Sequence, residues 1–297
     1  MSATLTTTDE LVVVAAQRRH RWIRTIDGIG LLATVITVIG AILWAFPLYW
    51  GIVTSLKPDA EVVKAGMKLY PDHFTLDAYT YALFGTNIGV WYLNSLITSV
   101  ATTVLVIIMA AGAGYAISQL EFPGRRVLWW MILASFMIPI QALIVNHFIL
   151  FSQFHLINTL TAVVGPQLLA PVTVIIYKQF FDSVPREMKE AAVVDGANEF
   201  QLLFRIYLPM NWGITTALAI ITFIAAWNNF LWPFLAVTSE DKMNITVGIT
   251  QVYDAFGVKY ARDLATAILA GLPVAIVYLI FQRRVTQAIM LSAGIKG

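Results

Sequence analysis

The sequence predicts an all-α integral membrane protein with six transmembrane helices. Of its 297 residues, 59% are hydrophobic and 12% are charged, which is about half the charged share of ordinary soluble proteins. A charge in the middle of a bilayer costs about 2.5–3.5 kcal/mol, so membrane spans appear as long windows without Asp, Glu, Lys or Arg. Six such windows are long enough to cross: 28–56, 88–118, 127–150, 157–177, 212–238 and 264–282.

The composition also excludes several classes of function. The chain has no cysteine, which excludes disulfides, cysteine-ligated metal centres and a cysteine nucleophile. Its four histidines form no closely spaced pair, so we expect no metal and no cofactor bound by this chain. A net charge of +2 without a Lys/Arg-rich stripe argues against nucleic-acid binding. The sequence shows no paired carboxylates and no plausible Ser/His/Asp set near a membrane face, so we do not expect an enzyme.

The spans divide the chain into segments, and we expect both termini in the cytoplasm. With the N-terminus inside, 13 of the 19 Lys and Arg residues fall in cytoplasmic segments, as the positive-inside rule requires. The Thr-rich start does not resemble a cleaved signal peptide. In order, the predicted segments are a cytoplasmic tail at 1–27, the first span at 28–56, an outer loop at 57–87, a core of five spans at 88–282 with an inner loop at 183–209, and a cytoplasmic tail at 283–297.

The inner loop at 183–209 predicts two short helices joined by a turn. Gly196 allows the left-handed conformation that ends the first helix, and Asn198 with Gln201 can form a capping box for the second. Pro209 is expected to end the second helix. Its expected apolar face consists of Phe200, Leu203, Phe204 and Tyr207. Periodicity alone leaves open a simpler interpretation, an amphipathic connector that lies on the lipid headgroups.

This loop resembles the EAA signature of ABC-importer permeases, in which a loop docks into a groove on an ATP-hydrolysing subunit. Every position of that signature is filled: Glu190-Ala191-Ala192, three residues, Gly196, nine residues, then Ile206, Leu208 and Pro209. The resemblance implies that Glu190 pairs with a basic group of the ATPase and that Ala191 and Ala192 allow close contact. Asp195, on the same helix face as Ala191 and Ala192, belongs to this expected coupling site.

The rest of the chain is similar to the MalG-type permeases of bacterial carbohydrate importers. Short motifs carry the likeness, among them 54–58, 75–79, 122–125 and 227–233. The resemblance implies the type I ABC importer permease fold in the bacterial cytoplasmic (inner) membrane. It also implies a second, different permease, an extracytoplasmic solute-binding protein and two ATPase subunits that hold ATP and Mg. The C-terminal residues Lys296 and Gly297 resemble a tail that reaches between the two ATPases in some relatives.

Polar side chains within the spans suggest a pathway for an uncharged solute. Amides can pair with sugar hydroxyls, and indole rings can pack on a sugar's apolar face. The candidates are Gln141, Asn146, His147, Trp227, Asn228, Asn229 and Trp232. Each has an ordinary structural alternative, because intramembrane amides often hold helices together and Trp often marks the membrane interface. The same alternative applies to Asn94 and Ser95 in the second span.

The predicted function is the permease subunit of an ATP-driven carbohydrate importer that works by alternating access. The chain lacks a G-x4-GK[ST] motif, so nucleotide must bind to a separate chain. The alternative is a secondary transporter of a small polar solute driven by an ion gradient. Such transporters usually keep ionisable groups inside the membrane, and the six charge-free windows count against one.

Overall fold

The structure is a computed structural model that describes residues 28–64, 68–252 and 258–292. Within these ranges every regular element is a helix. The predicted tail at 1–27 and the residues Lys296 and Gly297 lie outside the described residues. The chain divides into two compact units, Met1–Val53 and Thr54–Gly297.

The described part of the first unit is a single helix, α2 (Gly28–Ser55), whose last two residues belong to the second unit. At 1.5 Å per residue it is about 42 Å long, enough to cross a bilayer. Its large apolar side chains are exposed from Leu31 to Tyr49, while Val53 near its end is buried. The hydroxyls of Thr34 and Thr37 donate to the carbonyl oxygens of Gly30 and Ala33, each at 2.8 Å, so these polar groups are satisfied within the helix. An apolar surface with internally satisfied polar groups suits a lipid environment.

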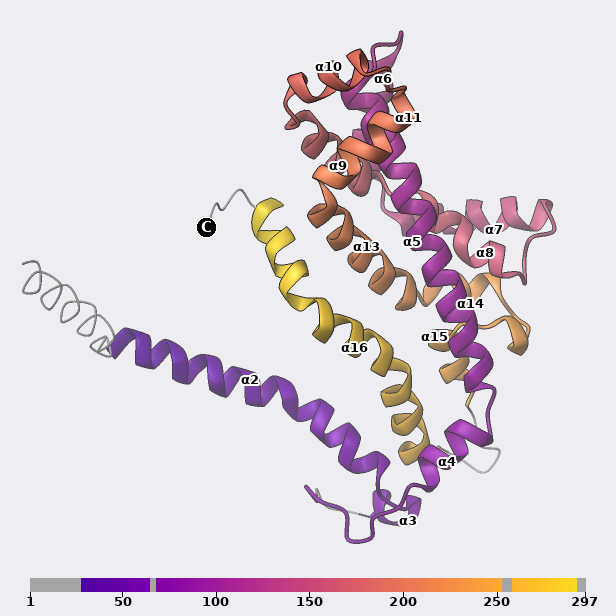
Figure 1. Cartoon of the computed structure of the whole chain (residues 1–297). Coiled ribbons are helices and arrows are strands. Elements are labelled where there is room, and N and C mark those ends of the chain that lie inside the picture. Colours follow the sequence, from indigo (N-terminus) through magenta and orange to yellow (C-terminus); the bar gives the residue numbers. More distant parts are fainter. Residues whose placement is uncertain (1–27, 65–67, 253–257, 293–297) are drawn as a thin grey trace, which may run out of the picture. The chain divides into compact units, whose positions relative to one another are not determined.

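In the second unit, α5 (Ile88–Gln119) is the element against which other spans pack. Both α9 (Pro171–Asp182) and α13 (Trp212–Trp227) lie along it, as Figure 1 shows. A Cβ on Gly114 would stand 2.7 Å from the Cβ of Tyr177 and 3.1 Å from the backbone nitrogen of Lys178. Glycine at this position therefore lets the backbones of α5 and α9 approach closely.

The last span is α16 (Tyr260–Ser292), which contacts α13 and α4 (Asp77–Phe84). It is one continuous helix through Pro273. It passes the predicted end of the span at residue 282, so the first ten residues of the predicted C-terminal tail are helical.

Three of the six predicted windows are not single helices. Three windows each hold one helix that is long and apolar enough to cross the membrane: α2, α5 and α16. The other candidate spans are bent pairs, at 97° after α6 (Arg125–Phe136), at 48° before α9 and at 86° before α13. Up to six spans remain if each bent pair counts as one, which agrees with the six spans that the sequence predicts.

Short helices complete the bent regions. After α6 come η1 (Ile140–Leu143) and α7 (Ile144–Gln153), and before α9 come α8 (Leu160–Val164) and η2 (Gly165–Leu168). Backbone that leaves the helical ladder at membrane depth must find other partners or line a cavity. The breaks therefore mark the places where a solute could meet polar groups.

Hydrogen bonds hold together the described residues of the predicted outer loop at 57–87. In the loop at 57–87, the buried Lys57 ammonium donates to the Lys68 carbonyl oxygen at 2.8 Å, and the Glu61 carboxylate accepts the backbone N–H of Asp72 at 2.9 Å and of His73 at 3.2 Å. These two backbone donors lower the pKa of the Glu61 carboxyl, with the Asp72 bond the larger cause. This loop contains α3 (Asp59–Val62) and α4.

The segment after α13 is held against α5. It contains α14 (Leu231–Ala236), η4 (Glu240–Lys242), α15 (Ile245–Gly248) and η5 (Ile249–Gln251). The Asn94 amide donates to the carbonyl oxygens of Asp241 and Met243 at 2.9 and 2.8 Å, and the Ser95 hydroxyl accepts the Ile245 N–H at 2.7 Å. Asn94 and Ser95 thus serve packing, which is the structural alternative considered for them.

Candidate functional site

The first helix, the turn and the start of the second helix in the inner loop at 183–209 are as the sequence predicts. α10 (Arg186–Val194) ends in a turn where Gly196 has a φ of 83°, in the left-handed region. The next helix, α11 (Glu199–Leu202), starts with the complete capping box of Asn198 and Gln201, both of whose hydrogen bonds measure 2.9 Å. The helix–turn–helix is confirmed, and it follows from interactions local to this segment.

Most of the predicted coupling residues lie on the exposed surface of this helix–turn–helix. Glu190, Ala191, Asp195 and Gly196 are exposed, while Ala192 is half-buried and packs against the core. Ile206 and Leu208 are half-buried against the same core, and Pro209 is exposed. The exposed surface of the segment is therefore formed by acidic and small residues, while its half-buried residues pack against the core of the spans.

The predicted apolar face of the second helix is confirmed at Leu203 and Tyr207 and wrong at Phe200 and Phe204. Phe200 and Phe204 are 77% and 50% exposed, whereas Leu202, Leu203 and Tyr207 are buried. The reason is that residues Leu203–Tyr207 form a π-helix, η3, whose wider turns break the 3.6-residue period on which the prediction rested. The two exposed phenylalanines add apolar side chains to the exposed surface of the loop.

Pro209 also does not end the helix, contrary to the prediction. The helix continues as α12 (Leu208–Met210), and the chain turns by 86° only at Asn211. In a regular α-helix the proline ring would clash with the carbonyl four residues earlier. The π-helical turns directly before it relieve this clash, so the break moves to the start of α13.

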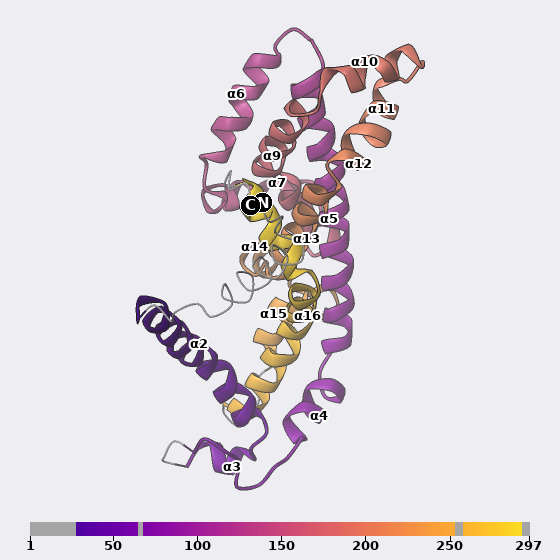
Figure 2. The same cartoon turned by 60° about the vertical axis from the view of Figure 1, so that its left-hand side comes forward.

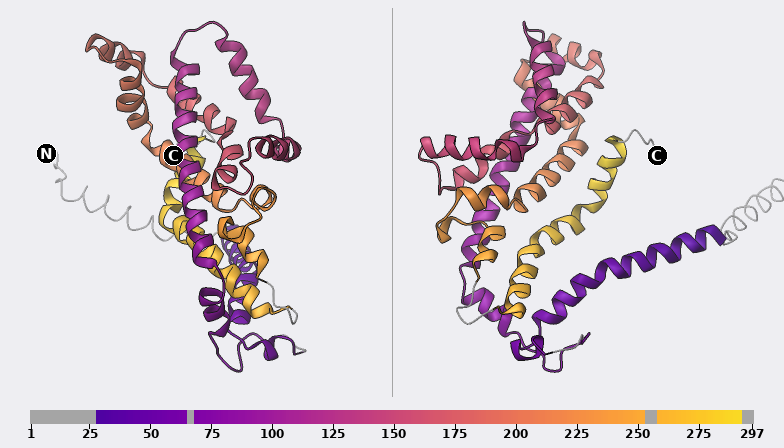
Figure 3. Two further views of the ribbon diagram at one scale, coloured as in Figure 1. Left: turned by 90° about the vertical axis from the view of Figure 1, so that its right-hand side faces the viewer. Right: turned by 180° about the vertical axis from the view of Figure 1, so that it is seen from behind.

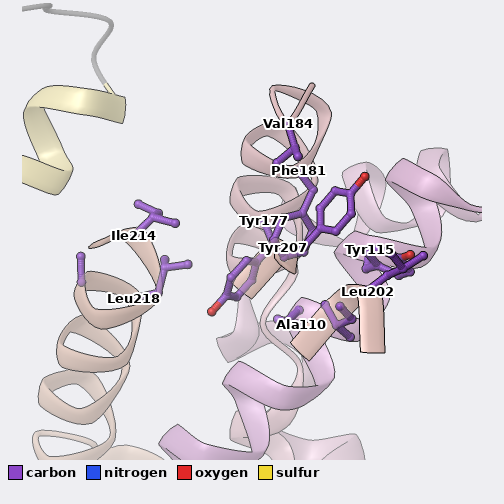
Figure 4. Close-up of a cluster of buried hydrophobic side chains, with 12 residues drawn as sticks. Ala110, Tyr115, Tyr177, Phe181, Val184, Leu202, Tyr207, Ile214 and Leu218 are labelled. Carbon is purple, nitrogen blue, oxygen red and sulfur yellow. The ribbon is translucent and has the colours of Figure 1, made fainter. Parts of the chain in front are cut away.

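The loop is fixed to the end of α5 by aromatic packing and by polar contacts. Figure 4 shows the buried cluster, in which the Tyr207 ring meets the rings of Tyr115 and Phe181 edge-on, with centroids 5.1 and 5.6 Å apart. The Tyr207 hydroxyl donates to Gln119 Oε1 at 2.8 Å, and the Lys189 ammonium donates to the Gln119 carbonyl oxygen at 2.9 Å. Five residues make these polar and aromatic contacts, and we call them the loop anchor: Tyr115, Gln119, Lys189, Tyr207 and Glu199.

Glu199 completes the loop anchor from the start of α11. Its carboxylate accepts a hydrogen bond from the Tyr115 hydroxyl. The Lys189 ammonium lies 4.0 Å from the same carboxylate. Both helices of the loop therefore connect to α5, and a displacement of either helix acts directly on this span.

A cavity of about 550 Å³ lies among the broken spans. Its walls come from α5, η1, α7, η2, α9, α13 and α14, so all three bent regions contribute to it. The lining is largely apolar, and its polar members are Thr102, Gln141, His147, Gln167, Thr173, Thr222 and Asn229. No Asp, Glu, Lys or Arg is among the lining residues that the structure describes.

The cavity brings together four of the seven predicted pathway residues: Gln141, His147, Asn229 and Trp232. The Trp232 N–H donates to the Ala162 carbonyl oxygen at 2.7 Å, so only the ring can meet a solute. That ring contacts His147 edge-on at a centroid distance of 5.9 Å.

The other three pathway residues lie elsewhere. Trp227 is buried, and its N–H donates to the Ala270 carbonyl oxygen at 3.3 Å. The Asn228 amide donates back to the Ile224 carbonyl oxygen at 3.0 Å, and Asn146 does not line the cavity.

The sequence analysis did not single out Thr102, Gln167, Thr173 and Thr222. Threonine inside a span usually bonds to its own helix, so it gave no distinct signal. Thr102 departs from that habit, since its hydroxyl is buried, lines the cavity and has no hydrogen-bond partner among the described residues. Among those same residues, no group of three or more His, Cys, Asp and Glu side chains could hold a metal ion.

The turn at Gly196 gives a prediction on local stability. Nothing lies within 4 Å of a Cβ placed on Gly196, so only the backbone conformation opposes a side chain there. Gly196→Val should destabilise the turn by about 1–2 kcal/mol, whereas Asn adopts this conformation readily. Hydrogen–deuterium exchange of residues 186–202 should be faster in the Val variant and near the parental rate in Gly196→Asn. Equal exchange in both variants would show that the turn does not depend on the left-handed conformation.

Comparison with known proteins agrees with this geometry. Residues 104–290 match the family described as "Binding-protein-dependent transport system inner membrane component". The chain is 30% identical over 260 residues to the arabinooligosaccharides transport system permease protein AraQ of Bacillus subtilis, with 86% of this chain and 92% of that protein covered. It is 31% identical to the diacetylchitobiose uptake system permease protein NgcG of Streptomyces coelicolor, with 94% and 91% covered.

A solved structure shares the fold. The crystal structure of a bacterial ABC transporter involved in the import of the acidic polysaccharide alginate matches with a TM-score of 0.76 at 21% identity, over 95% of this chain and 99% of that one. The architecture is thus that of a type I ABC importer permease. With the family model covering most of the chain and relatives above 30% identity along nearly its whole length, this chain belongs to the family of binding-protein-dependent transport system inner membrane components.

Proposed function

We propose that this chain is a permease subunit of an ATP-driven carbohydrate importer, working by alternating access. The observation that carries the proposal is the inner loop, which exposes Glu190 and Ala191 while the loop anchor fixes its two helices to α5. A partner that moves this surface would move a membrane span. The names of the relatives, among them permease proteins for arabinooligosaccharides and diacetylchitobiose, support a sugar as substrate.

The proposed partners follow from what this chain lacks. Two ATPase subunits would bind ATP and Mg and grip the inner loops of this chain and of a second, different permease. An extracytoplasmic binding protein would deliver the sugar to the side opposite the loop. In this arrangement the chain itself binds no nucleotide, and its N- and C-termini lie in the cytoplasm of a bacterium whose inner membrane it spans. ATP binding would close the ATPases and open the cavity outward, and hydrolysis would reset it.

The cavity suits a neutral, hydroxyl-rich solute. Gln141, Gln167 and Asn229 supply amides that both donate and accept, and the unpartnered Thr102 hydroxyl supplies another group. Apolar walls around few polar groups are typical of small-molecule sites. A transporter driven by an ion gradient usually keeps acids or bases within the membrane, and His147 is the one titratable side chain in the described lining, so the lining favours the ATP-driven alternative.

Filling the cavity should block transport. Thr222→Trp places an indole in the cavity, and we expect sugar uptake into proteoliposomes that hold the whole importer to fall at least about tenfold, which is ~1.4 kcal/mol in the barrier. Thr216→Trp is the matched control, because Thr216 lies on the same helix outside the lining. Equal uptake in the two variants would place the route elsewhere. ATP hydrolysis stimulated by the loaded binding protein, measured in parallel, tests the proposed function.

A further inference from the structure

A second cavity, distinct from the one among the broken spans, lies where α5 ends and α6 begins. It measures about 560 Å³, and its lining includes Ser118, Arg125, Arg126, Trp129, Lys178 and Asp182. We call this cavity the basic pocket. Its walls come from the last turns of α5 and α9 and from the first turns of α6. Of these three helices, α9 packs against both α5 and α6 (Figure 2). In Figure 3 the start of α6 lies at the same end of α5 as the helices of the inner loop.

The charges in the basic pocket leave a net positive site. The single acid in the lining, Asp182, accepts a hydrogen bond from the Ser118 hydroxyl at 2.6 Å with one oxygen and forms an ion pair with Lys178 through the other. Lys178 is thereby neutralised, and its ammonium stands 5.2 Å from the centre of the Trp129 ring. The guanidinium groups of Arg125 and Arg126 remain without an acidic partner among the described residues.

Both arginines keep donors for a ligand. Arg125 uses one nitrogen to donate to the Leu120 carbonyl oxygen at 2.7 Å, which leaves most of its five N–H groups. Arg126 is exposed and forms no hydrogen bond or ion pair within the described ranges. A guanidinium fork matches the geometry of a phosphate. In addition, the first turn of α6 carries no acid and no side-chain cap, so its backbone dipole also favours an anion there.

The surroundings of the basic pocket indicate a lipid. Directly after the two arginines, α6 exposes apolar side chains, with Val127 at 62%, Trp130 at 64% and Met131 at 56%. The charge-free windows end on both sides of the 119–126 connection, which places the pocket at the boundary between hydrocarbon and headgroups. Trp beside basic residues is typical of this interface, and basic pockets between membrane helices bind anionic headgroups.

We propose that the basic pocket binds the phosphate of an anionic phospholipid, with Arg125 and Arg126 holding the headgroup and the acyl chains lying along α6. The shared chemistry is a phosphate anion, and the attached chains distinguish the lipid from free phosphate. The proposal does not depend on which solute the chain transports.

The test uses the full-length chain with its co-purified partners in nanodiscs of mixed phosphatidylglycerol and phosphatidylcholine. Retained lipid is counted by native mass spectrometry after detergent release. We expect a preference for phosphatidylglycerol that falls about fivefold in Arg126→Gln and about 25-fold in Arg125→Gln/Arg126→Gln, from the usual contribution of one basic residue at an anionic surface. Lys64→Gln/Lys68→Gln removes two charges from the predicted outer loop and should leave the preference intact.

Three outcomes would overturn the proposal. The first is an unchanged preference in Arg126→Gln, whose side chain makes no internal contact that folding needs, so the single variant decides even if the double variant does not fold. The second is an equal loss in the Lys64/Lys68 control, which would indicate a general charge effect. The third is release of the lipid by millimolar inorganic phosphate, which would make the pocket a site for free anions.

Discussion

Glu190→Lys is expected to abolish coupling between the ATPases and the permease while leaving the protein inserted. Glu190 is exposed and forms no ion pair among the described residues, so its replacement breaks no internal contact. Substitutions of this kind change folding stability by only about 0.5 kcal/mol. At a charged interface the same reversal costs about 2–5 kcal/mol, because it places like charges together. We therefore expect uptake and retention of the ATPase during purification to fall at least about 30-fold.

A matched charge reversal distinguishes this effect from a general one. Asp241→Lys also reverses an exposed acid, on the segment after α13, and it removes only an exposed ion pair with Lys242. It should leave ATPase retention unchanged. Membrane yield and thermal stability in detergent show whether each variant is inserted and folded. Normal uptake and normal ATPase retention in Glu190→Lys would refute the coupling role of the loop.

Gly114→Ala is expected to destabilise the packing of α5 against α9. The added methyl group would stand 2.7 Å from the Tyr177 Cβ and 3.1 Å from the Lys178 backbone nitrogen. Neither is the end of a flexible side chain, so α5 and α9 must separate. Overpacking of this kind costs about 1–3 kcal/mol. The same change at Gly112, two residues earlier, meets nothing within 4 Å and should be neutral or slightly stabilising, since Ala favours a helix by about 1 kcal/mol.

The glycine pair can be compared by equilibrium unfolding in mixed micelles. The free energy of unfolding should decrease in Gly114→Ala and stay level or rise in Gly112→Ala. A similar decrease in both variants would contradict the role given to the contact between α5 and α9, because Gly112→Ala meets no neighbour and helix propensity favours Ala at both positions.

The sequence predicted those features that depend on neighbouring residues. The turn at Gly196 and the capping box of Asn198 and Gln201 are set within a few positions, and the structure has both. The uninterrupted spans α2 and α5 likewise follow from long charge-free windows. Here local composition decides the structure, so no tertiary information is needed.

The breaks in the spans could not be predicted in the same way. Proline stands at the breaks, as Pro139 and Pro171 do, yet Pro47 and Pro273 lie inside the continuous helices α2 and α16. The same residue type therefore gives both outcomes, and the packing around it decides which occurs. The π-helix before Pro209 is a further example, because it exposed Phe200 and Phe204 against the expected period.

The sequence predicted the polar pathway from residue types, but it could not show which of these side chains point into the cavity. Neighbouring residues on a helix point about 100° apart, so His147 can line the cavity while Asn146 does not. At the end of α13 the chain separates Asn229, in the cavity, from Asn228, which bonds back to its own helix. Choosing between such neighbours requires the positions of the surrounding helices.

One measurement tests the central claim that the inner loop is the contact for a separate ATPase. The chain has no cysteine, so Ala191→Cys introduces a single thiol on the exposed side of α10. We predict that a membrane-impermeant thiol reagent labels it only from the cytoplasmic face, and that a short bifunctional reagent joins it to the ATPase subunit with a yield that changes when ATP is added. Labelling from the outer face, or no joined product in an importer that transports normally, would contradict the account.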